Sequence, residues 1–486
     1  MENMMNFVVI MTDTQNRDMV GAYAGHPVDT PNLDRLAASG VRFNRAYTTC
    51  PLCTPARSAI FSGTHPTVNG AWCNNVPPYP TFPLMGSIFR HYGYRTAYTG
   101  KWHLDGSGYY GDGEAGGGFE SDWWYDGKRY AEDIGPAMFA AYQSCKTPDE
   151  LREAGFTLEN IWGHRAANRA IHFLESVGEE SFVLGVSFDE PHHPYVAPPE
   201  YWEKFSDKDL SFTERSDKAE AAKPELQSLH RRERMADGCG LNPDVMCRFF
   251  GCNSYVDHEI GRVIDAIDRL HPADTVVIYT SDHGDMLGHH GLAGKGPMMY
   301  DEICNVPLIV RTPGGNPAVS DAVVSHLDII PTMLDMAGME CPECLHGVPL
   351  RPILDGTAPT VHDAVMLSFT RFAVNHDAWG EFYPIRAMTD GRYKLALNLF
   401  ETDEFYDLAT DPYERSNLIA ASEFAAERNR LHDALLEEMD RIRDPFRSYR
   451  WGARSWRTVR EPFYGRGKRR DAPRRFQFQP SGIEAR

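Results

Sequence analysis

Short apolar runs of strand length alternate with helical patterns over the first three quarters of the chain. The candidate strands lie at residues 7–11, 95–99, 182–188, 275–280 and 307–311. A long helical pattern at 243–269 carries apolar residues at three- and four-residue spacing. This alternation is typical of crossover units on a parallel sheet. We therefore predict an α/β fold with a large, mainly parallel sheet flanked by helices.

The pattern changes after a predicted helix at 327–337. Short candidate strands follow at 364–369, 385–389, 393–399 and 405–408, separated by turns. They predict a smaller C-terminal antiparallel sheet, closed by a helix at about 421–441. We expect a large α/β domain over 1–360, an antiparallel β plus helix subdomain over 361–440, and a basic, aromatic tail over 441–486. A charged, turn-rich segment at 204–240 is interpreted as a surface insertion or lid.

The tail differs in charge from the rest of the chain. It holds 14 Arg or Lys residues and four Asp or Glu, a net charge of +10, so the remainder carries −29 of a total of −19. Because an acidic body repels nucleic acid, we expect the tail to pack on a neighbouring subunit of a homo-oligomer. No apolar run approaches the roughly 20 residues of a membrane span. The sequence predicts a cytoplasmic protein that binds neither nucleic acid nor a membrane.

The ten cysteines are too sparse for a disulfide framework in 486 residues. Cys341-Pro-Glu-Cys344 is the one CxxC pair, and a second pair at zinc-like spacing is missing. We expect most of the thiols to be free, and interpret this pair as a chance occurrence in a loop.

One cysteine stands in an unusual segment, Cys53-Thr54-Pro55-Ala56-Arg57. Proline two residues after the cysteine suits the first turn of a helix, so Cys53 would lie at the positive helix end with Arg57 one turn further on. An anion beside residue 53 would meet concentrated positive potential. A buried thiol beside a surface arginine is the alternative.

Asp13 and the pair Asp282-His283 each follow an apolar strand. Because open α/β sheets build their sites at the carboxyl edge, we expect these side chains to meet there. Two carboxylates and an imidazole can hold one divalent cation. Hard oxygen donors favour calcium or magnesium, whereas the histidine leaves manganese or zinc open.

These motifs resemble the signature of the type I, formylglycine-dependent sulfatases of the alkaline phosphatase superfamily. The resemblance spans residues 5–440 and includes further segments in the family's order and approximate spacing. They are Thr30-Pro31-Asn32-Leu33-Asp34, Gly100-Lys101-Trp102-His103, Pro191-His192-His193-Pro194, Ser281-Asp282-His283-Gly284-Asp285, Lys295, Asp390-Gly391-Arg392-Tyr393-Lys394 and Phe405-Tyr406-Asp407-Leu408. The resemblance implies a sulfuric ester hydrolase whose Cys53 is oxidised to formylglycine, and a formylglycine-generating or sulfatase-maturating enzyme as its partner.

In such a mechanism the formylglycine hydrate at residue 53 attacks sulfur with one hydroxyl, and the second hydroxyl later expels the sulfate. The resemblance implies that Arg57 and the metal lower the pKa of the attacking hydroxyl, while Lys101 orients it. His103 would deprotonate the second hydroxyl.

The resemblance also implies the groups that meet the substrate. His192 and Lys295 occupy the family's positions for contacting the sulfate and protonating the leaving oxygen. Asn74 would donate a hydrogen bond to the same anion, and His193 is a further candidate for substrate contact, with a structural role as the alternative.

The metal site departs from the family pattern in one place. Relatives commonly place a second acid or amide directly after the first aspartate, where this chain has Thr14. Gln15 or a water is the candidate to fill that place. Calcium is the expected ion.

Three functions compete for this sequence. We expect hydrolysis of sulfate monoesters, of carbohydrates or of aryl alcohols. A phosphonate or phosphate monoester hydrolase of the same superfamily is the first alternative, and Lys101 with His103 is the feature that argues against it. An inactive, polyanion-binding protein is the second. Aromatic residues that could stack on a sugar, or pack in the core or at a subunit contact, are Trp72, Tyr79, Trp102, Tyr109, Tyr110, Trp123 and Trp124.

Overall fold

The computed structural model describes residues 5–23, 28–145, 147–208, 210, 222–236, 243–374 and 382–457. Its larger sheet has eight strands in the order β4-β3-β5-β1-β6-β7-β2-β8. They are β1 (Asn6–Thr12), β2 (Val41–Tyr47), β3 (Arg95–Gly100), β4 (Trp124–Tyr125), β5 (Phe182–Ser187), β6 (Thr275–Ser281), β7 (Asn305–Arg311) and β8 (Ala318–Ser325). Among these strands only β7 runs antiparallel to its neighbours, which confirms the predicted mainly parallel sheet.

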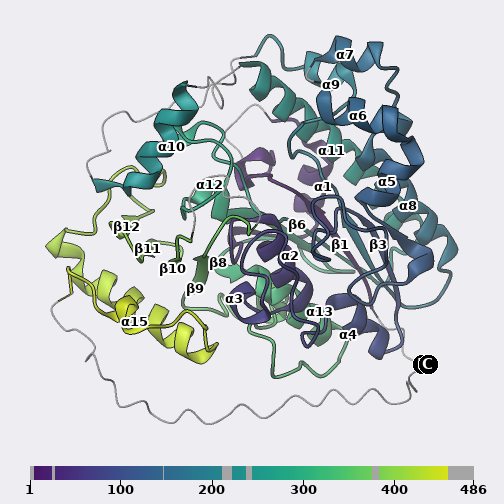
Figure 1. The fold of residues 1–486 in the computed structure, drawn as a ribbon. Coiled ribbons are helices and arrows are strands. Elements are labelled where there is room, and N and C mark those ends of the chain that lie inside the picture. The colour runs from purple at the N-terminus through teal and green to yellow at the C-terminus, as the bar shows by residue number, and fades with distance from the viewer. Residues whose placement is uncertain are drawn as a thin grey trace.

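Helices cover both faces of this sheet (Figure 1). Successive side chains of a strand point to opposite faces, and β1 supplies both layers. Phe7 and Val9 join the core under α2 (Cys53–Ser62), α4 (Met85–His91) and α13 (Ile329–Met336). Val8 and Ile10 join the opposite core under α1 (Pro31–Ser39), α8 (Trp162–Ser176) and α11 (Pro243–Leu270). The apolar runs without polar alternation therefore belong to strands that are buried on both faces.

The C-terminal part forms a second, antiparallel sheet in the order β12-β11-β10-β9. Its strands are β9 (Val365–Phe369), β10 (Ile385–Thr389), β11 (Tyr393–Asn398) and β12 (Glu404–Asp407), and α15 (Ala425–Arg441) packs on one face. The other face packs against residues of the larger domain, among them Tyr47 and Met298. The predicted antiparallel sheet with a closing helix is confirmed, and Figure 1 shows it beside the larger sheet.

Shorter elements border these layers. The α-helices among them are α3 (Pro66–Asn69), α5 (Gly127–Ile134), α6 (Pro136–Ser144), α7 (Pro148–Glu153), α9 (Pro199–Glu203), α10 (Glu225–Ala236), α12 (Asp301–Cys304), α14 (Arg351–Leu354) and α16 (Tyr449–Gly452). The single 3₁₀ turns are η1 (Arg17–Met19), η2 (Ser121–Trp123), η3 (Leu158–Asn160), η5 (His289–Gly291), η6 (His326–Asp328) and η7 (Ser422–Phe424). Of the helices that the structure describes, none has both the length and the apolar character needed to cross a membrane.

Three strands of the larger sheet, β2, β4 and β8, are absent from the sequence predictions, and β4 has only two residues. β2 alternates buried and half-buried residues, and the first half of β8 is largely exposed. Neither strand therefore contains the continuous apolar run that marks the buried strands. The nine cysteines within the described residues are free thiols, in line with the expectation.

The segment at 204–240, interpreted as a surface insertion or lid, contains the helix α10. Gln227 on this helix is buried between the larger domain and the C-terminal subdomain. Tyr300 Oη, in the larger domain, donates to its Oε1 at 2.6 Å, and its Nε2 donates to Glu404 Oε2, in the C-terminal subdomain, at 3.3 Å. α10 is thus a docked element, while residues 209, 211–221 and 237–242 lie outside the described residues.

The first part of the basic tail packs on its own chain. Trp451 is fully buried in the core that α15 shares with the antiparallel sheet, and Arg454 forms an ion pair with Asp403 at 2.5 Å. Residues 441–457 thus include side chains that belong to the core of their own chain, while packing of the tail on a neighbouring subunit stays a prediction. Residues 458–486 lie outside the described residues.

Candidate functional site

Four polar side chains follow four neighbouring strands at the carboxyl edge of the larger sheet. Lys101 follows β3, Asp189 follows β5, Asp13 follows β1, and Asp282 follows β6. Because these strands are parallel and adjacent, their ends bring the four residues together. The backbone there is tightly packed: a Cβ on Gly100 would lie 1.8 Å from Ser187 O, and its φ is +103°. Only glycine fits this close approach of β3 to β5.

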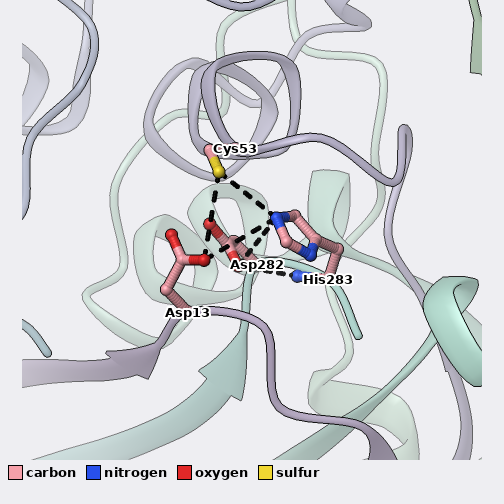
Figure 2. Close-up of side chains that lie close together, drawn as sticks. All are labelled: Asp13, Cys53, Asp282 and His283. Atoms are coloured by element: carbon pink, nitrogen blue, oxygen red, sulfur yellow. Dashed lines mark hydrogen bonds and ion pairs between the residues drawn. The ribbon is translucent and has the colours of Figure 1, made fainter. Parts of the chain in front are cut away.

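Cys53 reaches the cluster from the opposite side, as the first residue of α2 (Figure 2). Every residue of this helix is buried, and Cys53 itself is only 2% exposed. Its Sγ lies 3.4 Å from His283 Nε2 and 3.9 Å from Asp13 Oδ1, and Lys295 Nζ donates to it at 3.0 Å. The sulfur therefore lies at a positive helix end and beside an ammonium group, as the sequence predicts for an anion at residue 53.

Arg57 lies one turn further along α2 and is completely buried. Its Nη2 lies 3.0 Å from Asp13 Oδ2 and its Nε lies 3.0 Å from Asp282 Oδ2. The alternative of a surface arginine is therefore wrong. The guanidinium holds one oxygen of each carboxylate, and both Oδ1 atoms remain on the side of Cys53 and His283.

Positive charges dominate the electrostatics around residue 53. Burial raises the pKa of the Asp13 carboxyl, but Lys101, Lys295, His192 and Arg57 outweigh it and hold that pKa well below its usual value. Burial and Asp13 also oppose ionisation of the Cys53 thiol, and Lys295 and Lys101 nevertheless hold its pKa well below the usual range. The site is therefore built to stabilise negative charge at residue 53.

Asp13, Asp282, His283 and Cys53 form a group whose potential ligand atoms all lie within 4.8 Å of one another. His283 Nδ1 lies 2.9 Å from Gly284 O, so Nδ1 carries the proton that it donates and Nε2 faces the cluster as a lone pair. Two carboxylate oxygens and this nitrogen fit a divalent cation. The sequence-predicted metal residues are thus brought together.

The residues after Asp13 do not supply a further ligand side chain. Thr14 Oγ1 donates to Asp13 Oδ1 at 2.5 Å, and Thr14 has a φ of 69°. Gln15, the candidate for the missing ligand, uses its amide nitrogen on Asn253 at 2.6 Å and its carbonyl oxygen on Thr12 and Tyr279. Gln15 therefore belongs to the packing behind β1, because its amide is saturated there.

His103 and Asn74 border Cys53 on the side of its helix start. His103 Nε2 lies 2.8 Å from Asn75 Oδ1, and its buried Nδ1 has no hydrogen-bond partner among the described residues. Asn74 Oδ1 accepts a hydrogen bond from Thr54 N at 3.1 Å, and Asn74 N donates to Phe372 O at 2.9 Å. The carbonyl end of Asn74 thus binds the first turn of α2, which is a contact that the sequence interpretation did not include.

His192 and Lys295 are the partly exposed members of the cluster, with side chains that are 20% and 10% exposed. His192 Nε2 lies 3.9 Å from Asp13 Oδ1, and Lys295 Nζ lies 3.8 Å from the same oxygen. His193 is exposed and its ring packs against Tyr195, so the structure does not bring this side chain to the cluster.

Two residues of the site are absent from the sequence-based set of catalytic and binding residues. Asp189 lies 3.0 Å from Lys101 Nζ through its Oδ1, and Tyr109 Oη lies 2.5 Å from the same oxygen. The signal that identified Asp13, an acid directly after an apolar strand, also marks Asp189. Tyr109 is one of the aromatic residues considered for sugar stacking, and no spacing rule predicts its contact because it comes from an irregular loop.

A separate cavity of about 520 Å³ lies beyond the turn η1, between the larger sheet and the loop at 408–413. Arg17, Arg42 and Arg45 line it together with Asp18, Asp301 and Asp321. Basic and acidic side chains are mixed in this cavity, and none of the residues around Cys53 lines it. We therefore assign the catalytic chemistry to the cluster around Cys53.

Residues 5–339 match the family model described as Sulfatase, and residues 288–441 match the model described as N-sulphoglucosamine sulphohydrolase, C-terminal. The chain is 43% identical over 464 residues to the uncharacterized sulfatase YidJ of Escherichia coli K12, covering 94% of this chain and 91% of that protein. It is 26% identical over 517 residues to an N-acetylglucosamine-6-O-sulfatase of Bacteroides thetaiotaomicron, covering 90% and 87%. Its fold is similar to a solved phosphonate monoester hydrolase from Silicibacter pomeroyi, with a TM-score of 0.75, 22% identity and coverage of 90% and 96%.

Proposed function

Because this chain belongs to the sulfatase family, a family of sulfuric ester hydrolases, we propose that it cleaves sulfate monoesters with formylglycine derived from Cys53 and one divalent cation. The observation that carries this proposal is the position of Cys53. Its side chain lies at the start of a buried helix, within reach of Lys295 and of the group Asp13, Asp282 and His283. Nothing in the bare packing of a thiol requires so many charged neighbours.

The residues around Cys53 can bind and orient a sulfate ester. A bound cation would supply positive charge to the nucleophile, and a formylglycine hydrate would supply two hydroxyls, one to attack sulfur and one to release sulfate. Asp13, Asp282 and His283 would hold the cation, which we expect to be calcium. Lys101 is fixed by Asp13 at 2.8 Å and Asp189 at 3.0 Å, so its ammonium is held where it can orient the nucleophile.

Two histidines are suited to move protons. His103 donates from Nε2 to Asn75, which leaves Nδ1 as the basic nitrogen, and it would accept the proton of the second hydroxyl at that atom. His192 faces the cluster with Nε2, and in its imidazolium form, which carries the second proton at that nitrogen, it would give this proton to the departing oxygen. Lys295, at 3.0 Å from Cys53 Sγ, would neutralise the charge of the sulfate.

Peptide mass spectrometry combined with turnover of a nitrophenyl sulfate tests the role of Cys53. We expect formylglycine at residue 53 in active protein and essentially complete loss of turnover in Cys53→Ala. Cys50→Ala is the matched control, because the Cys50 thiol is equally buried but its pKa is raised by burial, which is the behaviour of an inert core thiol. Fully active protein with an unmodified thiol at residue 53 would exclude the mechanism.

Removal of the cation tests the metal site. Treatment with a chelator should abolish turnover, and restoring calcium, magnesium or manganese should recover it. Asp282→Asn should prevent this recovery, because a neutral amide replaces one of the two carboxylates. Unchanged activity in exhaustively chelated enzyme contradicts the site.

A phosphonate or phosphate monoester hydrolase is the second candidate function, favoured by the fold similarity to the Silicibacter pomeroyi enzyme. Lys101 and His103, both packed around Cys53, favour the sulfate ester. The ratio of kcat/KM for nitrophenyl sulfate and phenyl phosphonate in one preparation decides between them, and we expect the sulfate to be preferred.

We propose sulfated carbohydrates as the substrate class. The named activity of the Bacteroides thetaiotaomicron relative and the C-terminal family model both concern sulfated glucosamine. A screen of sulfated mono- and disaccharides beside aryl sulfates would identify the alcohol, and turnover of aryl sulfates alone would contradict this choice.

A further inference from the structure

The side chain of His192 is held through the ring nitrogen that points away from Cys53. Its Nδ1 lies 2.7 Å from the backbone oxygen of His193 and 2.7 Å from Tyr109 Oη. A carbonyl oxygen can only accept, so Nδ1 carries a proton and donates it. A second proton can therefore be added only at Nε2, the nitrogen that faces Asp13 and the cluster.

Tyr109 is in turn held by a carboxylate. Its Oη lies 2.5 Å from Asp189 Oδ1, and Lys101 Nζ lies 3.0 Å from the same oxygen. Burial raises the pKa of Asp189 above its usual value, and the ammonium of Lys101 and the hydrogen bond from Tyr109 reduce this rise. Burial and Asp189 raise the pKa of Tyr109 well above its usual value, so the phenol keeps its proton and donates it to Asp189. The oxygen of Tyr109 is then free to accept from His192 Nδ1.

The ring of Tyr109 has a second contact within the site. Lys101 Nζ lies 3.6 Å from the ring centroid, a cation–π arrangement. One residue thus contacts both Lys101 and His192. The two contacts can be separated by substitution, because phenylalanine keeps the ring and removes only the hydroxyl.

We propose that Tyr109 and Asp189 are positioning residues: they hold the Nδ1 proton of His192 on the side away from Cys53, so that Nε2 faces the leaving oxygen and the second proton, carried there by the imidazolium form, is the one transferred. This inference rests on the proposed function. A donor held in place helps most when the leaving alcohol is basic, as in a sugar, and least when it is an acidic nitrophenol. The fall in kcat on removing the Tyr109 hydroxyl should therefore depend on the pKa of the leaving alcohol. A purely structural role of Tyr109 does not predict such a dependence.

The test compares Tyr109→Phe with Tyr110→Phe over a graded series of phenyl sulfates. Tyr110 is the matched control, because it is the next residue and its hydroxyl meets only Gln143 Nε2, at 3.3 Å, among the hydrogen bonds of the described chain. We expect Tyr109→Phe to lower kcat roughly 10- to 100-fold for the most basic leaving groups and little for nitrophenyl sulfate, with smaller changes in KM. His192→Ala should show the same selectivity, and His193→Ala a small, uniform loss.

A spectroscopic measurement keeps the inference testable without turnover. Nitrogen NMR of ¹⁵N-histidine-labelled protein, with His192 assigned through His192→Ala, should show the Nδ1-protonated tautomer in the wild type. Tyr109→Phe should show a larger share of the Nε2-protonated tautomer, because only one of the two acceptors of Nδ1, the His193 carbonyl, remains. An unchanged tautomer together with an equal loss across the phenyl sulfate series would overturn the inference. If the wild type cleaves no sulfate ester, the proposed function fails, while the NMR comparison still decides whether Tyr109 orients His192.

Discussion

Arg57 shows how a single residue organises this site. Beyond the two carboxylates, its Nη1 donates to Lys101 O at 2.6 Å and to Ser187 Oγ at 2.8 Å, all without exposure to water. The planar fork of a guanidinium can serve these acceptors together, whereas a lysine ammonium cannot match their spacing. Arg57 thus ties the ends of β1, β3, β5 and β6 to the helix that carries Cys53.

Arg57→Lys should accordingly lower both stability and turnover. We expect a loss of roughly 1–3 kcal/mol in the free energy of unfolding, because buried acceptors lose their donors, and a fall in kcat on the order of 100-fold. Urea denaturation and steady-state kinetics measure the two effects. Arg90→Lys, at an exposed position of α4, is the control, and equal effects in both variants would contradict the role of Arg57.

Glu190 provides a pH-dependent prediction at a single buried side chain. It is 2% exposed, its Oε1 accepts from Gly163 N at 2.9 Å, and burial with Asp189 raises its pKa to about 8. The folded chain therefore binds a proton that the unfolded chain releases near its ordinary value of 4.5. This contribution to stability is complete below the unfolded pKa and is lost as the pH rises toward 8.

Glu190→Gln removes this ionisation. We expect the variant to lose less stability than the wild type between pH 5 and about 8, as measured by thermal unfolding across that range. If the melting temperatures of the two proteins change with pH in the same way, Glu190 remains charged in the folded protein.

The sequence can identify site residues that directly follow a strand, but it cannot identify those that an irregular loop brings to the site. Asp13 and Asp282 each follow an apolar run, so their convergence follows from the sheet alone, whereas Lys101 follows the more polar strand β3 and is implied only by the family resemblance. The role of Tyr109 depends on the path of the glycine-rich loop after His103, where several positive φ angles redirect the chain. No periodicity encodes such a path, so the contact with His192 became visible only in three dimensions.

At the scale of elements, the helix α10 supports the loop that presents Lys295. Arg231 Nε donates to His290 O at 2.6 Å, and His230 Nε2 lies 3.4 Å from Ala293 O. The sequence around α10 lacks a clear apolar period, because its buried contacts are polar, as at Gln227. The sequence of α10 therefore indicates a surface insertion although the helix is docked, whereas the apolar stripe of α11 predicts a helix correctly.

Arg231→Ala should loosen the Lys295 loop without altering the reacting atoms. We expect KM to rise about fivefold, equivalent to about 1 kcal/mol, with little change in kcat, because Lys295 holds the sulfate in the ground state and the transition state alike. Arg232→Ala, at an exposed neighbouring position, is the control. A fall in kcat with constant KM would contradict this interpretation of α10.

At the scale of the whole molecule, we expect the two parts of the basic tail to make different contacts. Residues 441–457 belong to the C-terminal subdomain through Trp451 and Arg454, and we propose that residues 458–486 contact a neighbouring acidic subunit. Truncation after residue 457 should therefore yield smaller particles in sedimentation while the fold stays intact. Truncation after residue 440 should in addition lower the melting temperature. A particle size unaffected by the first truncation contradicts the proposed contact.

The enclosure of Cys53 has a consequence for the order of events during synthesis. Its partner His283 is 230 residues further along the chain, and Lys295 is 242 residues further. At about 5–20 residues per second, a ribosome needs roughly 12–46 seconds to add that length. During this interval the segment around Cys53 has emerged, but the strand and loop that cover it do not yet exist. The proposed oxidation of Cys53 by another enzyme would therefore have to take place before these later residues enclose it. We expect slower elongation between residues 53 and 283 to raise the fraction of protein that carries formylglycine.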